Sequence, residues 1–93
     1  HQAQAGDWSI GWRWHPSQQF DPALLRQWLQ GLDWRRAKLV IHSADGWVSA
    51  NAVDNTMLTW QPSEWRRDSR IELIFSEKQD VAELQKALAA CRQ

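Results

Sequence analysis

The strongest constraint on the fold is the dipeptide Asp45-Gly46, which stands between two apolar segments. Residues 36–43 contain the aliphatic run Leu39-Val40-Ile41, and residues 47–53 return with similar apolar character. Asp-Gly in this position is a strong signal for a tight β-hairpin, because such turns need residues that tolerate a positive φ. The sequence therefore predicts an antiparallel pair of strands in the middle of the chain.

Two other segments alternate apolar with polar residues, which is typical of strands that bury one face. The first covers 7–14 and ends at His15-Pro16, because proline has no N–H to donate to a strand ladder. The second covers 71–75, and a further strand is expected over 57–61, after a turn at Asp54-Asn55. One face of the first strand carries Trp8, Ile10, Trp12 and Trp14, and the other carries Ser9, Gly11 and Arg13.

Two segments have the spacing of amphipathic helices. The first is expected to begin with Asp21 as N-cap and Pro22 at the first helical position, and to end near Gly31. The second begins with Asp80 as N-cap, followed three residues later by Glu83, as in a capping box. The expected apolar stripes are Leu24, Leu25, Trp28, Leu29 and Leu32 in the first helix, and Val81, Leu84, Leu88 and Cys91 in the second.

These elements predict a small single α+β domain. Apart from the short run at 57–61, their order is β-α-β-β-β-α, which favours a mostly antiparallel β-sheet with two helices on one face. Residues 1–6 lack any periodicity and are expected to be a disordered lead-in or a tag remnant, which leaves 7–93 as the domain. A chain of 93 residues is too short for a doubly wound nucleotide-binding sheet.

The aromatic composition is unusual, with eight tryptophans, two phenylalanines and no tyrosine. Small domains bury a limited share of their surface, and a large aromatic side chain enlarges a small core. We therefore expect most of the tryptophans to be buried. The alternative is a row of exposed indoles that stack on sugars or bases.

The sequence contains no pattern typical of catalysis or metal binding. His15 and His42 have no serine or cysteine partner in a local arrangement, and no histidine or cysteine pair has ligand spacing. Cys91 is the single cysteine, which excludes an internal disulfide, and its place on an apolar stripe predicts a buried, inert thiol. We therefore expect no catalytic residue and no cofactor or metal site in this chain.

The charge balance also narrows the partners. Eleven basic side chains match eleven acidic ones, so a general nucleic-acid binder is not expected. No apolar run approaches the length of a membrane span, and no membrane association is expected.

Two basic clusters, Trp34–Lys38 and Trp65–Arg70, interleave arginine with tryptophan, the residue types enriched at protein-contact hot spots. The other interpretation is a solvated surface with Asp33, Glu64 and Asp68 as local counter-ions, or arginines that tie the second cluster to its own sheet. The candidate protein-contact residues are Arg13, Arg36, Lys38, Trp65, Arg66, Arg67 and Arg70.

Five segments in one order resemble the C-terminal domain of the CobW-type P-loop GTPases, over about Asp7–Arg92. They are Gly11-Trp12-Arg13-Trp14, the helix opening Phe20-Asp21-Pro22, Arg36-Ala37-Lys38, the stretch from Trp65 to Ile74, and Leu88-Ala89-Ala90-Cys91.

The resemblance implies a cytoplasmic metallochaperone of cobalamin synthesis or zinc homeostasis, whose separate GTPase domain binds GTP, Mg and a transition metal such as zinc or cobalt. Neither the G-x-x-x-x-G-K-[ST] loop nor the Cys-x-Cys-Cys motif of that domain occurs here, and no histidine-rich tract is present. The expected function is a non-catalytic regulatory or docking domain that contacts the GTPase domain in cis or a metalloprotein client. The alternative is a free-standing, tryptophan-rich binding module for carbohydrate or single-stranded nucleic acid.

Overall fold

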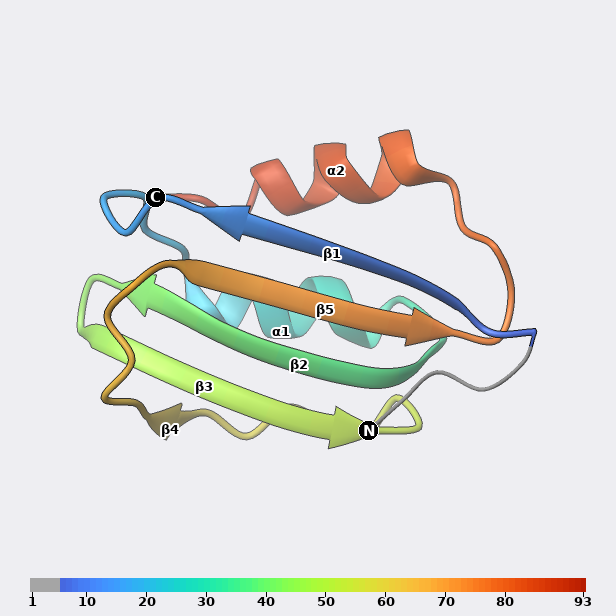
Figure 1. The fold of residues 1–93 in the computed structure, drawn as a ribbon, viewed down its shortest axis with the longest axis horizontal. Helices are drawn as coiled ribbons and strands as arrows, with labels where there is room; N and C mark the ends of the chain where they lie inside the picture. Colours follow the sequence, from blue (N-terminus) through green and yellow to red (C-terminus); the bar gives the residue numbers. More distant parts are fainter. Residues whose placement is uncertain (1–5) are drawn as a thin grey trace.

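Five strands form a single antiparallel sheet in the order β1-β5-β2-β3-β4 (Figure 1). The structure is a computed structural model that describes residues 6–93. The predicted lead-in, residues 1–6, lies outside this range except for Gly6. The strands are β1 (Trp8–Trp14), β2 (Trp34–Ser43), β3 (Gly46–Val53), β4 (Gln61–Pro62) and β5 (Ser69–Phe75), and the helices are α1 (Pro22–Gln30) and α2 (Val81–Ala89).

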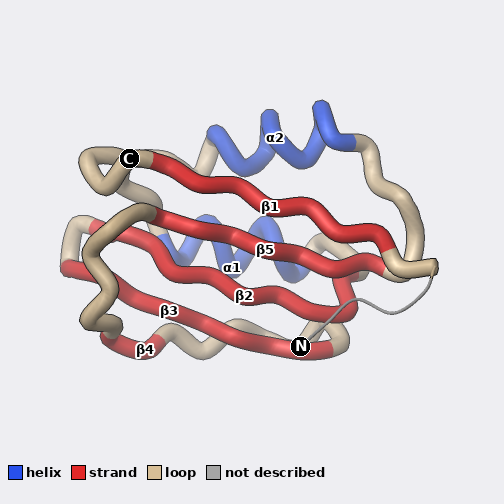
Figure 2. The backbone as a smooth tube through the Cα atoms, viewed as in Figure 1, coloured by secondary structure: helices blue, strands red, loops and turns tan. Residues whose placement is uncertain are grey.

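Both helices lie on the same side of the sheet (Figures 1 and 2). Strands β1 and β2 run parallel to each other, because each is antiparallel to β5, which lies between them. Helix α1 connects these two strands behind the sheet. The structure confirms the predicted α+β class, the antiparallel sheet and the order β-α-β-β-β-α, to which β4 adds a two-residue edge strand.

The predicted hairpin is formed by β2 and β3, which pair from Arg36↔Val53 to Ser43↔Gly46. Its two turn residues are Ala44 and Asp45, and Gly46 takes a φ of +119° as the first residue of β3. The Ser43 hydroxyl closes the turn by donating to the Gly46 carbonyl over 2.6 Å. The glycine is needed here because a residue with a Cβ rarely adopts this φ.

The strand predicted over 57–61 is wrong for most of its length. Of the predicted residues, only Gln61 pairs with β3, and Pro62 pairs beside it. Residues 56–60 have no regular secondary structure. Leu58 is instead buried in the core, and the Trp60 indole N–H donates to the Pro22 carbonyl of α1 over 3.1 Å. An irregular segment thus places apolar side chains between the sheet edge and α1. The same residues cannot pair with β3 at the same time.

The helices begin as the sequence predicts. The Asp21 carboxylate accepts the Ala23 N–H over 2.9 Å, and the Asp80 carboxylate accepts the Glu83 N–H over 3.1 Å. Gly31 follows the last residue of α1 as its C-cap.

The apolar stripes are narrower than predicted. Leu25 and Leu29 of α1 are buried, whereas Leu24 is 41% exposed, since neighbouring helical residues point about 100° apart. In α2 the buried residues are Leu84 and Leu88, with Cys91 beyond the helix end. Val81, in the first turn, is 38% exposed, so α2 is anchored by its later turns.

The core lies between the helices and one face of the sheet. It includes Phe20, Trp34, Leu39, Ile71 and Phe75. The Trp34 indole N–H donates to the Leu29 carbonyl over 2.9 Å, so this large buried side chain also satisfies its polar atom. None of the described helices is long and apolar enough to cross a membrane.

Most of the tryptophans contribute to this core, as predicted, although fewer of them are fully buried than expected. Trp34 and Trp47 are buried, and the remaining six are half-buried. The half-buried tryptophans packed against the core are Trp8, Trp12, Trp14, Trp28 and Trp60. Within residues 6–93, none of the tryptophans is fully exposed, so this part of the chain has no row of exposed indoles for stacking on sugars or bases.

Candidate functional site

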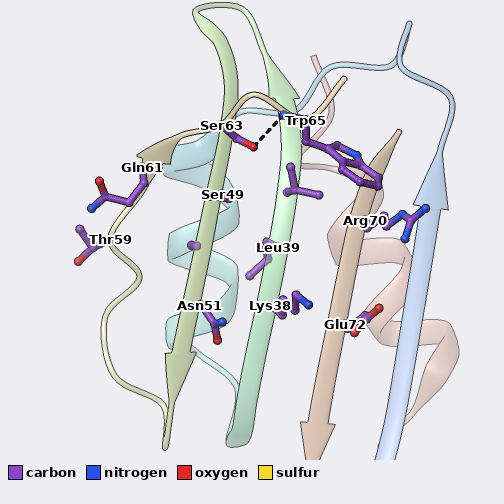
Figure 3. Close-up of a pocket in the computed structure, with 12 residues that line it drawn as sticks. Lys38, Leu39, Ser49, Asn51, Thr59, Gln61, Ser63, Trp65, Arg70 and Glu72 are labelled. Atoms are coloured by element: carbon purple, nitrogen blue, oxygen red, sulfur yellow. Dashed lines mark hydrogen bonds between the residues drawn. The ribbon is translucent and has the colours of Figure 1, made fainter. Parts of the chain in front are cut away.

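Within residues 6–93, the face of the sheet opposite the helices has no element packed over its middle (Figure 1). Most of the predicted contact residues lie on this face, among them Lys38, Trp65 and Arg70 (Figure 3). The alternation of side chains that buries one face of each strand sends the intervening residues to this open face. Strand register then aligns them in cross-strand rows. The rows are Arg13–Arg70–Val40–Ser49, Gly11–Glu72–Lys38–Asn51 and Ser9–Ile74–Arg36–Val53.

The open face carries a trough, formed by two adjoining hollows of about 590 and 580 Å³ that share Lys38, Asn51 and Glu72. Arg70 and Trp65 line the first hollow, and Arg36 and Gly11 line the second. Figure 3 shows Trp65 at one end of the first hollow, with Lys38, Glu72 and Asn51 farther along the strands. The other polar side chains of the trough are Ser9, Ser49, Thr59, Gln61 and Ser63.

Trp65 is held in place by its own loop. Its backbone N–H donates to the Ser63 hydroxyl over 3.2 Å, and its indole N–H donates to the Asp68 carbonyl over 2.8 Å. The guanidinium carbons of Arg70 and Arg67 lie 4.7 and 5.5 Å from the centre of its ring, within cation–π range. The ring is therefore a positioned aromatic wall at the end of the trough.

Arg70 is positioned from two sides. Besides the Trp65 ring, it contacts Asp68, whose carboxylate accepts the Arg70 Nε–H over 2.7 Å. This hydrogen bond is the main reason that the pKa of Asp68 lies below its ordinary value. Arg70 thus presents a guanidinium of fixed orientation, and Asp68 already balances part of its positive charge.

Arg66 is bound to its own loop, and not to the sheet as one interpretation of the sequence had it. Its guanidinium donates to the Ser63 carbonyl over 2.6 Å and to the Trp65 carbonyl over 2.8 Å, so it ties the loop to itself. Arg67 is exposed, and its guanidinium lies against the Trp65 ring.

The strand cations differ in how far they are already engaged. The Arg36 Nε–H donates to the Asn51 side-chain carbonyl over 3.1 Å. Arg13 and Lys38 are exposed, and neither makes an ion pair with another described residue. Lys38 and Arg13 therefore have charges available for a partner.

The structure brings together Arg13, Arg36, Lys38, Arg70 and Trp65, and it places Arg66 and Arg67 in the loop beside them. Sequence reasoning missed Gly11, Asn51 and Glu72 as parts of the same surface. Their alternation in the strands was visible, but the strand order that makes them neighbours was not.

His15, His42 and Cys91 each make contacts within the domain, and a ring nitrogen of His15 lies 2.8 Å from the Ser17 hydroxyl oxygen. A His42 ring nitrogen is 2.7 Å from the Pro16 carbonyl oxygen, and the ring stacks on Trp47 with centroids 4.7 Å apart. Cys91 is buried as predicted, and burial raises the pKa of its thiol. Among the described residues, no group of three or more histidine, cysteine or acidic side chains could hold a metal ion.

Comparison with known proteins identifies the family. The family described as the cobalamin synthesis protein cobW C-terminal domain matches residues 9–92, which is nearly the whole chain. No curated protein and no solved structure matches the sequence. The chain belongs to this family and is an accessory domain of CobW-type proteins.

Proposed function

We propose that this CobW C-terminal domain, spanning residues 7–93, is a non-catalytic docking domain of a GTP-dependent metal chaperone. It contacts the GTPase domain in cis or a metalloprotein client, in the cytoplasm. GTP, Mg and a transition metal such as zinc or cobalt belong to the GTPase domain, and this chain supplies none of their ligands. Family membership supports the link to a GTPase, and the uncovered cationic face supports docking.

The observation that carries this proposal is the gathering of four cationic side chains on one uncovered sheet face of a neutral chain. Arg13, Arg36, Lys38 and Arg70 come from three different strands and share that face. Glu72 is the acidic residue that faces them in the same rows. A basic surface of this kind attracts an acidic partner surface and orients it.

Docking of this kind can report the nucleotide state without any chemistry in this domain. If the GTPase domain presents different surfaces in its GTP and GDP states, their different free energies of contact shift the equilibrium between docked and undocked arrangements. The antiparallel sheet keeps the cations in fixed positions, so little ordering is needed when the partner binds.

The test is calorimetric titration of this chain into a CobW-type GTPase domain, loaded with GDP or with a non-hydrolysable GTP analogue. We expect binding whose affinity differs between the two states. The double variant Arg13→Glu/Lys38→Glu should weaken it by about tenfold or more, because both charges are unpaired within the described residues.

The matched control is Lys78→Glu/Lys86→Glu, which makes the same change in net charge away from the open face. It should bind as the unchanged chain does. Equal affinity of both double variants would remove the assignment of the open face. Absence of association in both nucleotide states would overturn docking to the GTPase domain.

A further inference from the structure

Gly11 is a glycine that the fold itself does not require. It lies in the middle of β1, and its φ is outside the positive range. A Cβ added there would meet the Ile71 carbonyl oxygen at 3.5 Å and the Glu72 Cγ at 3.7 Å, which are ordinary contacts. A strand interior favours a residue with a side chain, and a glycine there often marks the close approach of a ligand or another backbone.

The missing side chain at Gly11 leaves an opening in the trough. Gly11 shares a cross-strand row with Glu72 and Lys38, and all three line the second hollow. Without a side chain at Gly11, an incoming chain can approach the sheet closely at this point.

The side chains around the opening suit a peptide backbone with acidic residues on either side. Glu72 accepts hydrogen bonds, and Asn51 both donates and accepts them, as the N–H and C=O groups of a main chain require. Cations stand toward both ends, with Arg70 in the first hollow and Arg36 in the second. Their rows are four residues apart, or about 13 Å along the strands, which is the spacing of residues i and i+4 in an extended segment.

We propose that the trough binds an extended acidic peptide segment of the protein partner. Its main chain runs over Glu72 and Lys38, with Gly11 and Asn51 on either side, and carboxylates four residues apart contact Arg70 and Arg36. The inference rests on the proposed docking function and names the kind of partner segment that the open face takes. The row of Glu72 lies midway between those of Arg70 and Arg36, so Glu72 would repel the closely and regularly spaced charges of a phosphate backbone. A peptide can place an uncharged residue there, which favours a peptide over a nucleic acid.

The probe is a short dye-labelled threonine peptide in which glutamates stand four residues apart, and binding is followed by fluorescence anisotropy. The comparison peptide has glutamine in place of each glutamate. We expect the glutamate peptide to bind at least about tenfold more tightly than the glutamine peptide, and increasing salt to weaken it.

Two variants locate the binding. Gly11→Val fills the floor of the trough, and Lys38→Glu reverses the charge shared by both hollows. Each should lower the affinity for the glutamate peptide by about tenfold, whereas Lys78→Glu should leave this affinity unchanged. Thermal melts of each variant establish that it is folded, and Lys38→Glu tests the site even if Gly11→Val does not fold.

The outcomes separate this inference from the proposed function. Docking of the GTPase domain without peptide binding would overturn the proposal of an acidic peptide segment, while the proposed docking function would stand. Peptide binding that Gly11→Val and Lys38→Glu abolish would support the trough, even if the GTPase domain failed to dock. Equal binding to all variants, or tighter binding of single-stranded oligothymidylate at the same site, would overturn the inference.

Discussion

Replacing Gly11 with alanine is expected to stabilise the domain. Most single substitutions destabilise a protein, so a gain at this position is an unusual result to predict. The prediction follows from the backbone of β1, where Gly11 pairs with Glu72 of β5 and has no positive φ. An alanine can adopt this conformation and restricts the unfolded chain more than glycine does.

The magnitude follows from the surroundings of the added methyl group. Its nearest heavy atoms, at 3.5 and 3.7 Å, leave no steric penalty to subtract. Glycine within a strand is less stable than alanine by about 0.5–1 kcal/mol, which sets the expected gain in unfolding free energy. For a domain of this size, that gain corresponds to a rise in Tm of about 2–8 °C.

The assay is differential scanning calorimetry, supported by urea unfolding followed through tryptophan fluorescence. Gly46→Ala is the matched control, because Gly46 has a φ of +119° in the β2–β3 hairpin. The same added methyl group should there lower the unfolding free energy by more than about 1 kcal/mol.

A lower Tm for Gly11→Ala would refute the reasoning. It would mean that the fold itself needs the glycine, and that Gly11 no longer points to an approaching chain. A higher Tm would show that the fold does not need the glycine, and it would agree with a binding partner as the reason for this residue.

Three other predictions concern the core, a helix cap and pH. Trp34→Phe removes the indole hydrogen bond to Leu29 and two buried ring carbons, so chemical denaturation should show a loss of about 2–3 kcal/mol. Asp21→Ala removes the N-cap of α1, and thermal melts should show a loss of about 1 kcal/mol. Because Arg70 lowers the folded-state pKa of Asp68, this carboxylate stabilises the fold above its ordinary pKa of 3.8 and loses that effect as the pH falls through the lower folded-state value. The stability difference between the unchanged chain and Asp68→Asn should therefore be constant near neutral pH and shrink below about pH 4, and a difference that grew on acidification would contradict this assignment.

Local signals in the sequence determined most of the elements. Asp45-Gly46 between apolar runs predicted the hairpin, and Asp21 and Asp80 marked where the helices begin. Each of these signals acts over a few residues, through backbone dihedral preferences or a hydrogen bond to a nearby N–H. Such interactions involve only residues that are close in the chain, so they can be predicted from the sequence.

The segment before β4 shows where local signals fail. The pattern over 57–61 resembles a strand, yet Leu58 and Trp60 turn toward the core and α1. The free energy gained by this burial depends on a helix more than thirty residues earlier in the chain, as the Trp60–Pro22 hydrogen bond shows. A short window of sequence contains no information about that contact.

The candidate site depends on both levels. The sequence by itself determined which side of each strand is polar, and it made Arg13, Arg36, Lys38 and Arg70 candidates for protein contact. Only the tertiary structure decided that they share one face, because β5 lies between β1 and β2 and aligns residues that are distant in the chain. Strand order is set by the packing of the whole sheet against its helices, so the trough exists only once the domain has folded.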